Sequence, residues 1–157
     1  MTGSELAFAA FGVTTEALLL GFFAARRWAP EIAARFGWVV YAFSGLGLPL
    51  GAWLLLDGQT WKLFAGPLLM AAWAAFGFVV DIWRPRPWRG PPVVWKTLVP
   101  YVALYFSAQM FLWWPLWNIN RAAWAAYLVL FVPSTILNIR GHATSGSKPG
   151  GEATQAR

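Results

Sequence analysis

One carboxylate stands in the middle of an apolar stretch near the N-terminus. The residues GVTTEALLLG, 12 to 21, place Glu16 among aliphatic and small side chains. In a helix that crosses a membrane, a charged side chain at that depth costs about 2.5–3.5 kcal/mol on insertion scales. We therefore expect Glu16 to face protein or water rather than lipid, and to be an ionisable group that can hold a proton.

Polar side chains on two later segments are candidate partners for this carboxylate. Four residues with hydrogen-bonding groups recur at every fourth position of one segment: Tyr101, Tyr105, Gln109 and Trp113. Nearer the C-terminus, three polar residues share a face of another segment: Tyr127, Ser134 and Asn138. Residues at these spacings lie along one side of a helix. If the two faces converge on Glu16, they form a polar track through the membrane.

Two hypotheses account for these residues. The first is a proton-responsive or small-molecule site, with Glu16 as the ionisable group. Its orienting partners are Tyr105, Gln109, Ser134 and Asn138. In the second, neutral Glu16 donates a hydrogen bond to Gln109 or to a backbone carbonyl and only joins helices, a contact that contributes about 0.6 kcal/mol. Replacing Glu16 by Gln separates them, because only the first hypothesis predicts a loss of pH-dependent activity.

A basic and aromatic loop, WRPRPWRGPPVVWK, covers residues 83 to 96. Its cationic side chains are Arg84, Arg86, Arg89 and Lys96. The prolines favour an extended chain that presents these side chains to contact anionic lipid headgroups or an acidic partner. The preference of Lys and Arg for cytoplasmic loops, together with interfacial tryptophans, accounts for the same composition without a specific contact.

Several classes of chemistry have no support in the sequence. Cysteine is absent and histidine occurs once, so thiol nucleophiles are excluded and we expect no metal site. Paired carboxylates, nucleophile–base arrangements and phosphate-binding loops are also missing. We therefore expect no enzyme activity and no cofactor. The net charge of +6 lies beside the apolar segments, so we expect no nucleic-acid partner.

The segments that must position these residues are membrane helices. Of the 157 residues, 59% are hydrophobic and only 11% are charged. A spanning helix needs about 20 mainly apolar residues. Five segments qualify: 6–25, 36–56, 61–82, 97–117 and 122–139. Their apolar runs lack the alternation of β-barrel strands. We predict an all-α, polytopic integral membrane protein with a transmembrane domain, 1–139, built as a bundle of five helices.

The basic residues predict the orientation of this bundle. With five spans, ten Lys and Arg residues fall on one side, and only Lys62 and Arg121 fall on the other. Because these residues collect on cytoplasmic loops, we predict an N-terminus outside and a C-terminus in the cytoplasm. The expected location is the plasma membrane, of the bacterial inner or cell membrane type. Residues 140–157, rich in Gly, Ser and Thr, are expected to form a disordered cytoplasmic tail.

Small residues and prolines predict how the helices pack. Gly47 and Gly51 form a GxxxG pair that favours close contact between the second and third spans. Pro49 lies between them, removes a backbone hydrogen bond and is expected to kink the helix. Pro133 has the same effect in the fifth span, where the hydroxyl groups of Ser134 and Thr135 are expected to satisfy the freed backbone groups.

The stretch RPRPWRGPPVVWKTLVPYVALYFSAQMFLWW, residues 84–114, has prolines and tryptophans before a span that contains tyrosine. It resembles the first loop and adjoining helix of the tryptophan-rich sensory proteins, or translocator-protein family. The resemblance covers about a fifth of the chain and implies binding of porphyrins or sterols. In that family most helices follow this stretch, whereas here only one span does. The resemblance therefore transfers no site residues, and tetrapyrrole or lipid binding is an alternative function.

The expected function follows from size and composition. Five short-looped helices enclose little volume, so we predict an accessory or interaction subunit of the plasma membrane. Its partners are the lipid bilayer and a homo-oligomer or larger membrane complex. The alternative is binding or transport of a lipophilic small molecule or a proton through the polar site around Glu16. Extraction as a large complex would favour the first function, and a monomer that binds a lipophilic ligand would favour the second.

Overall fold

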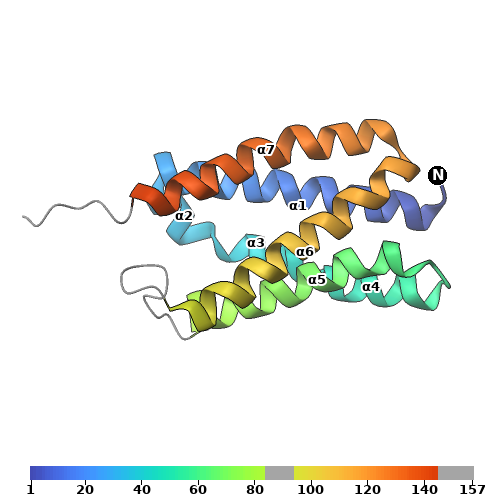
Figure 1. Ribbon diagram of the computed structural model, residues 1–157, viewed down its shortest axis with the longest axis horizontal. Helices are drawn as coiled ribbons and strands as arrows, with labels where there is room; N and C mark the ends of the chain where they lie inside the picture. The colour runs from blue at the N-terminus through green and yellow to red at the C-terminus, as the bar shows by residue number, and fades with distance from the viewer. Residues whose placement is uncertain (84–93, 145–157) are drawn as a thin grey trace, which may run out of the picture.

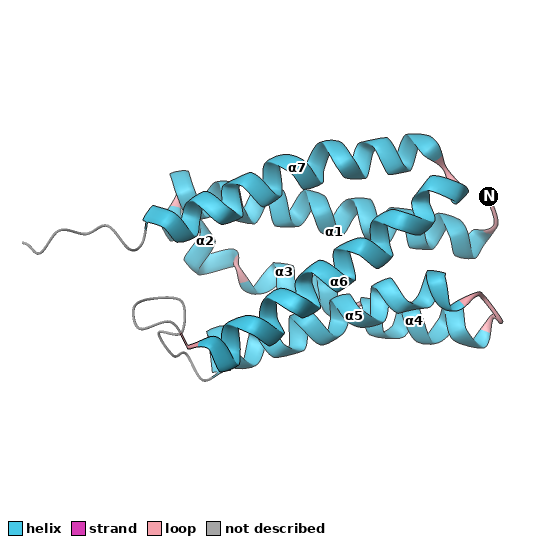
Figure 2. Cartoon of the chain, in the orientation of Figure 1, coloured by secondary structure: helices cyan, strands magenta, loops and turns pink. Residues whose placement is uncertain are grey.

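The computed structural model describes residues 1–83 and 94–144, with the backbone alone for residues 141–144. Within these two stretches every regular element is helical (Figures 1 and 2), which confirms the predicted all-α class. In chain order the elements are α1 (Gly3–Trp28), α2 (Pro30–Phe36), α3 (Trp38–Gly45), α4 (Gly47–Leu56), α5 (Trp61–Phe78), the π-helix η1 (Val79–Trp83), α6 (Trp95–Ile119) and α7 (Arg121–Thr144).

The long helices run roughly along the longest axis of the molecule, with α6 crossing the others obliquely (Figure 1). Four helical segments in the described part are long and apolar enough to cross a membrane: Gly3–Trp28, Trp38–Leu56, Trp61–Trp83 and Arg121–Arg140. They indicate a membrane protein. Helix α6 has a comparable length, but its prolines, tryptophans and Gln109 lower its mean hydropathy. By length and hydropathy, four of the five predicted spans are therefore able to cross a membrane.

Several helix ends differ from the predicted ones. Residues 30–36 form the short helix α2, with Pro30 in its first turn, where a proline costs no hydrogen bond. The second span consequently begins at Trp38 instead of residue 36. Helix α7 continues to Thr144, past the predicted end at residue 139. Part of the expected tail is thus helical, and residues 145–157 lie outside the described residues.

The second span is interrupted close to Pro49. Helix α3 ends at Gly45 and α4 begins at Gly47, with Leu46 between them. The carbonyl group of Gly45 would normally accept a hydrogen bond from the residue four positions later, which is Pro49 and has no N–H group. The disruption that the sequence predicts around this proline is therefore present, one turn before the proline itself.

Glycines set the distance between α4 and α5. A Cβ atom added to Gly51 would lie 2.6 Å from the side chain of Leu68, and one added to Gly47 would collide with the backbone of Pro67. This confirms the predicted contact of the second and third spans through the GxxxG pair. The two backbones approach closely because these positions carry no side chain.

A further glycine, which the sequence analysis did not select, joins α5 to α6. A Cβ atom on Gly66 would lie 2.7 Å from the carbonyl oxygen of Phe111. Helix α6 is therefore held against α5 by direct backbone contact. On the other side of the molecule, α1 packs along α7 (Figure 1), and there the ring of Tyr127 lies 3.7 Å from the position of a Cβ atom on Gly12.

Candidate intramembrane polar site

Glu16 is enclosed halfway along α1. Its side chain is 0% exposed, and it interacts with the side chains of Ser134 on α7 and Gln109 on α6. Neither carboxyl oxygen has a hydrogen-bond partner among the described residues. The carboxyl group thus faces protein rather than lipid, as the sequence predicts, and its hydrogen-bonding capacity is not used up by a fixed contact.

Gln109 on α6 lies between the carboxyl group of Glu16 and Tyr127 on α7. The hydroxyl group of Tyr127 on α7 donates a hydrogen bond to Oε1 of Gln109. The Nε2 atom of Gln109 is buried and has no partner in the described part of the chain. Because Oε1 is occupied by Tyr127, the amide group presents its two N–H donors as the free end of the side chain.

Two further hydroxyl groups complete the site. Tyr105 on α6 is 4% exposed and Ser134 on α7 is 0% exposed, and neither hydroxyl group has a hydrogen-bond partner within the described stretches. Tyr105 interacts with Glu16, Ser134 and Gln109. Tyr127 also interacts with Glu16 and Tyr105. We call the five residues that converge here, from α1, α6 and α7, the Glu16 cluster: Glu16, Tyr105, Gln109, Tyr127 and Ser134.

Trp73 on α5 packs between the Glu16 cluster and α3. The indole ring of Trp73 on α5 is 2% exposed and packs against Tyr105, with ring centroids 5.6 Å apart. It also contacts Tyr41 on α3 at 5.5 Å and Tyr101 on α6 at 5.6 Å. Trp73 is therefore the tryptophan best placed to sense a change at the Glu16 cluster.

The structure brings together four of the five residues that the sequence nominates: Glu16, Tyr105, Gln109 and Ser134. Asn138 lies one turn beyond Ser134 on α7, is only half-buried, and takes no part in the interactions described above. Tyr127 is the fifth member; the sequence places it on the same helix face as Ser134 but does not include it in the proton site. Its signal was its spacing of seven residues from Ser134, which places both side chains on the same face of α7.

One prediction about α7 is wrong. The hydroxyl groups of Ser134 and Thr135 were expected to satisfy backbone groups freed by Pro133, but both are without a hydrogen bond among the described residues. Helix α7 continues through the proline without this repair. The hydroxyl group of Ser134 instead faces the carboxyl group of Glu16, and it is available to that group.

Most cationic residues of the basic loop lie outside the part of the chain that the structure describes. Arg84, Arg86 and Arg89 lie outside the described residues. Lys96 stands exposed in the first turn of α6. Whether these residues contact anionic lipid stays a prediction.

The chemistry available to the Glu16 cluster is the exchange of a proton. An ionised carboxyl group accepts hydrogen bonds only, whereas the protonated form also donates one. The amide N–H groups of Gln109 donate, and the hydroxyl groups of Tyr105 and Ser134 can either donate or accept by rotating. The surroundings therefore contain suitable partners for both forms of Glu16.

No family model matches the chain, and neither does any curated protein or solved structure. The resemblance of residues 84–114 to the tryptophan-rich sensory proteins thus gains no support.

Proposed function

We propose that this protein is a small multi-pass membrane protein in which Glu16 binds and releases a proton within the helix bundle. One observation carries the proposal: a fully buried carboxyl group without a hydrogen-bond partner among the described residues faces an amide nitrogen and two hydroxyl groups that also lack partners there. Buried polar groups are nearly always paired, so a cluster of unpaired ones calls for an explanation, and proton exchange supplies one. An ionisable residue inside a membrane is the strongest form of that signal.

The proton would act by changing how α1 meets α6 and α7. Protonated Glu16 can donate a hydrogen bond to the hydroxyl oxygen of Ser134 or Tyr105. Ionised Glu16 would instead draw donors toward itself, above all the amide N–H groups of Gln109. Since Gln109 is also bound by Tyr127, a shift of its side chain would be transmitted to α7.

The test is a pH titration of tryptophan fluorescence in lipid nanodiscs. The wild-type protein is expected to show a transition that the Glu16→Gln variant lacks, with helical content unchanged. Glu31→Gln, which neutralises an exposed carboxylate on α2, is the matched control and should keep the transition. Trp73→Phe should remove most of the signal if Trp73 is the reporter. A transition that persists in Glu16→Gln would refute the proposal.

We further propose five membrane spans, with the N-terminus outside and the C-terminus in the cytoplasm of a bacterial-type plasma membrane. The basic residues support this arrangement. Helices α1 and α7 end, and α6 begins, at the same end of the bundle as α2 (Figure 1). Five described basic residues belong to these helix ends: Arg26, Arg27, Arg35, Lys96 and Arg140. The other two basic residues in the described stretches, Lys62 and Arg121, stand at the starts of α5 and α7, which lie at the opposite end (Figure 1). Basic residues favour the cytoplasmic side.

Helix α6 is the predicted span that its hydropathy supports least. Whether it crosses the membrane can be tested with single cysteine variants, because the chain has no cysteine of its own. Single variants Lys96→Cys and Arg121→Cys place a thiol group in the first turn of α6 and just after its end. A membrane-impermeant maleimide added to intact cells is expected to label Arg121→Cys and to label Lys96→Cys only after the cells are opened. Equal labelling of both in intact cells would show that α6 does not cross the membrane.

An accessory or interaction subunit is the second candidate function. It is favoured by the complete enclosure of Glu16, which is 0% exposed, because a sealed polar contact can join helices without exchanging protons. Mild detergent extraction at native expression levels distinguishes the candidates. A complex larger than a few copies of this chain, together with a pH-insensitive fluorescence signal, would favour the accessory function.

A further inference from the structure

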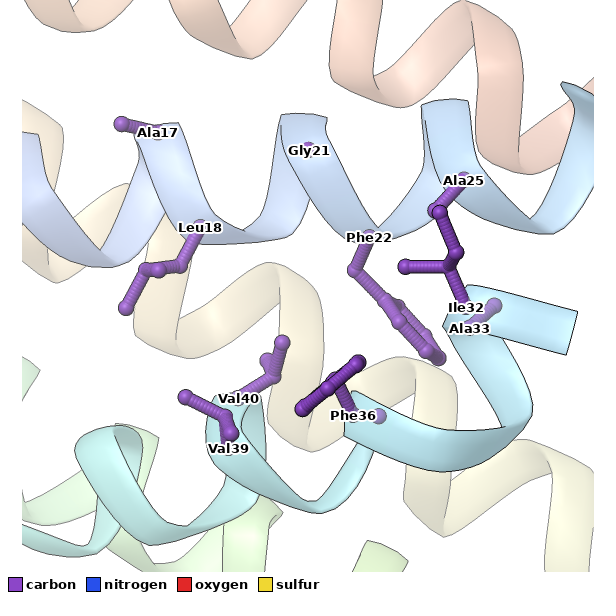
Figure 3. Close-up of a pocket in the computed structure, with 11 residues that line it drawn as sticks. Ala17, Leu18, Gly21, Phe22, Ala25, Ile32, Ala33, Phe36, Val39 and Val40 are labelled. Atoms are coloured by element: carbon purple, nitrogen blue, oxygen red, sulfur yellow. The ribbon is translucent and has the colours of Figure 1, made fainter. Parts of the chain in front are cut away.

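A second site lies on the opposite side of α1 from its contacts with the cluster. A groove of about 380 Å³ opens between α1, α2 and α3 (Figure 3). Such a volume falls in the usual range of small-ligand pockets. The side chains of Leu18 and Phe22 reach into it from α1, and those of Phe36 and Val40 reach into it from the other side. All eleven residues that line it are apolar.

The groove follows the direction of α1. Its lining runs from Ala17, near the middle of the helix, to Ala25 in its last turns. At 1.5 Å per residue this is a length of about 12 Å. A groove with this direction and lining suits a hydrocarbon chain that lies parallel to the helix axis, as the acyl chains of a bilayer do.

Cationic groups stand at the end of the groove where α1 finishes. The guanidinium group of Arg26 lies over the ring of Phe22, 5.7 Å from its centroid, and that of Arg35 lies over the ring of Phe36 at 5.3 Å. Both rings line the groove. Arg27 is close by in sequence, and Glu31 is the one acidic residue between Arg26 and Arg35. This end of the groove therefore carries a net positive charge.

We infer that the groove between α1, α2 and α3 is a binding site for one anionic phospholipid, with an acyl chain along Leu18 and Phe22 and the phosphate group near Arg26 and Arg35. The charge at its end selects the headgroup, since arginine pairs well with phosphate. The apolar lining holds the chain. None of the residues at this site belongs to the basic sequence 83–96, and the site does not depend on proton binding by Glu16.

Gly21 offers a way to fill the groove without disturbing the fold. It lines the groove, and a Cβ atom added there would meet no atom within 4 Å. Gly21→Leu should therefore occupy the space of the acyl chain, while replacing glycine also improves helix propensity. Ala17→Leu fills the same groove one turn earlier and is the second variant if the first does not fold. Gly45→Leu is the matched control, because it too has open space around it, away from this groove.

The experiment measures lipid retention by native mass spectrometry after reconstitution in an equal mixture of phosphatidylglycerol and phosphatidylcholine. The wild-type protein is expected to retain one phosphatidylglycerol molecule preferentially. Gly21→Leu should lose it, and Gly45→Leu should keep it. The double variant Arg26→Gln/Arg35→Gln should lower the headgroup preference about thirtyfold, given the usual contribution of each basic residue beside an anionic surface.

Two cationic side chains that lie over aromatic rings at the other end of the bundle provide a control for the loss of charge. Lys62 lies over the ring of Trp114 at 5.1 Å and Arg121 over that of Trp117 at 5.0 Å. Lys62→Gln/Arg121→Gln should leave retention unchanged. Retention that survives in Gly21→Leu or Ala17→Leu, or that falls equally in both charge variants, would overturn the site. Loss in Gly21→Leu with the headgroup preference intact in Arg26→Gln/Arg35→Gln would overturn the selection of anionic lipid.

Discussion

The two sides of α6 contact their neighbours in different ways. Toward α5, the backbone of Phe111 lies against Gly66, with 2.7 Å between its carbonyl oxygen and the position of a Cβ atom. Toward α1 and α7, the same helix presents Tyr105 and Gln109 to a buried carboxyl group. The first contact leaves no room for a side chain, whereas the second consists of polar groups with unused hydrogen-bonding capacity.

The difference follows from how helices associate in lipid. Lipid is as apolar as leucine, so contacts depend on close packing of small residues or on hydrogen bonds between side chains. A backbone contact at a glycine tolerates little change in volume and therefore fixes the position of α6. Hydroxyl and amide groups can rotate and exchange partners, so the other side of α6 can respond to a proton. We expect stability to come mainly from the glycine side, and function from the polar side.

The largest effect should come from Gly66→Leu. The new side chain would collide with the backbone of Phe111, which cannot move away as a flexible side chain could. We expect a loss of about 3 kcal/mol or more, as for severe overpacking, measured by unfolding in mixed micelles. The same change at Gly21, where space is open, should leave stability unchanged. Equal effects at both positions would contradict the assignment of this contact as the fixed one.

An intermediate effect is expected from Tyr127→Phe. It removes the donor to Gln109 and leaves Oε1 of that amide unpaired in a buried site. The expected loss is about 1 kcal/mol, the usual net value of a hydrogen bond. Tyr105→Phe is the control, because the hydroxyl group of Tyr105 has no hydrogen-bond partner in the described part and its removal should cost less. A larger loss in Tyr105→Phe would reverse this order.

The smallest effect on stability should come from Ser134→Ala. The hydroxyl group is buried and unpaired among the described residues, so its removal should leave the free energy of unfolding unchanged or slightly raised. It should nevertheless move the midpoint of the pH transition in fluorescence, because Ser134 faces Glu16. Thr135→Val removes a neighbouring unpaired hydroxyl group, and should move neither quantity. An unmoved midpoint in Ser134→Ala would exclude Ser134 from the proton site.

Much of the polar side of α6 was visible in the sequence. Spacings of four and seven residues placed Tyr105 with Gln109, and Tyr127 with Ser134, on single helix faces. The high cost of exposing Glu16 to lipid indicated that these faces would turn toward it. Periodicity shows which residues share a helix face, but not how far along the helix that face is buried. Asn138 was therefore assigned to the proton site, although it is only half-buried at the end of the face.

The glycine side of α6 was not visible in the sequence. The spacing of Gly47 and Gly51 identified them as a GxxxG pair. Gly66 has no second glycine four residues away, so its sequence does not distinguish it from other glycines in apolar helices. Its importance depends on which residue of another helix lies opposite it. The groove between α1, α2 and α3 was hidden for the same reason, and because most of α2 falls between the predicted spans 6–25 and 36–56.

The sequence by itself determined that this chain is helical and membrane-spanning in character, and that a carboxyl group on its first helix needs polar partners, because these follow from local hydropathy and helical periodicity. Only the tertiary structure decided that Gln109 and Ser134 meet that carboxyl group, that α6 is held by Gly66, and that an apolar groove ends between Arg26 and Arg35. These depend on the relative positions of helices. In lipid those positions are set by shape and hydrogen bonds between distant segments, rather than by the hydropathy of each segment alone.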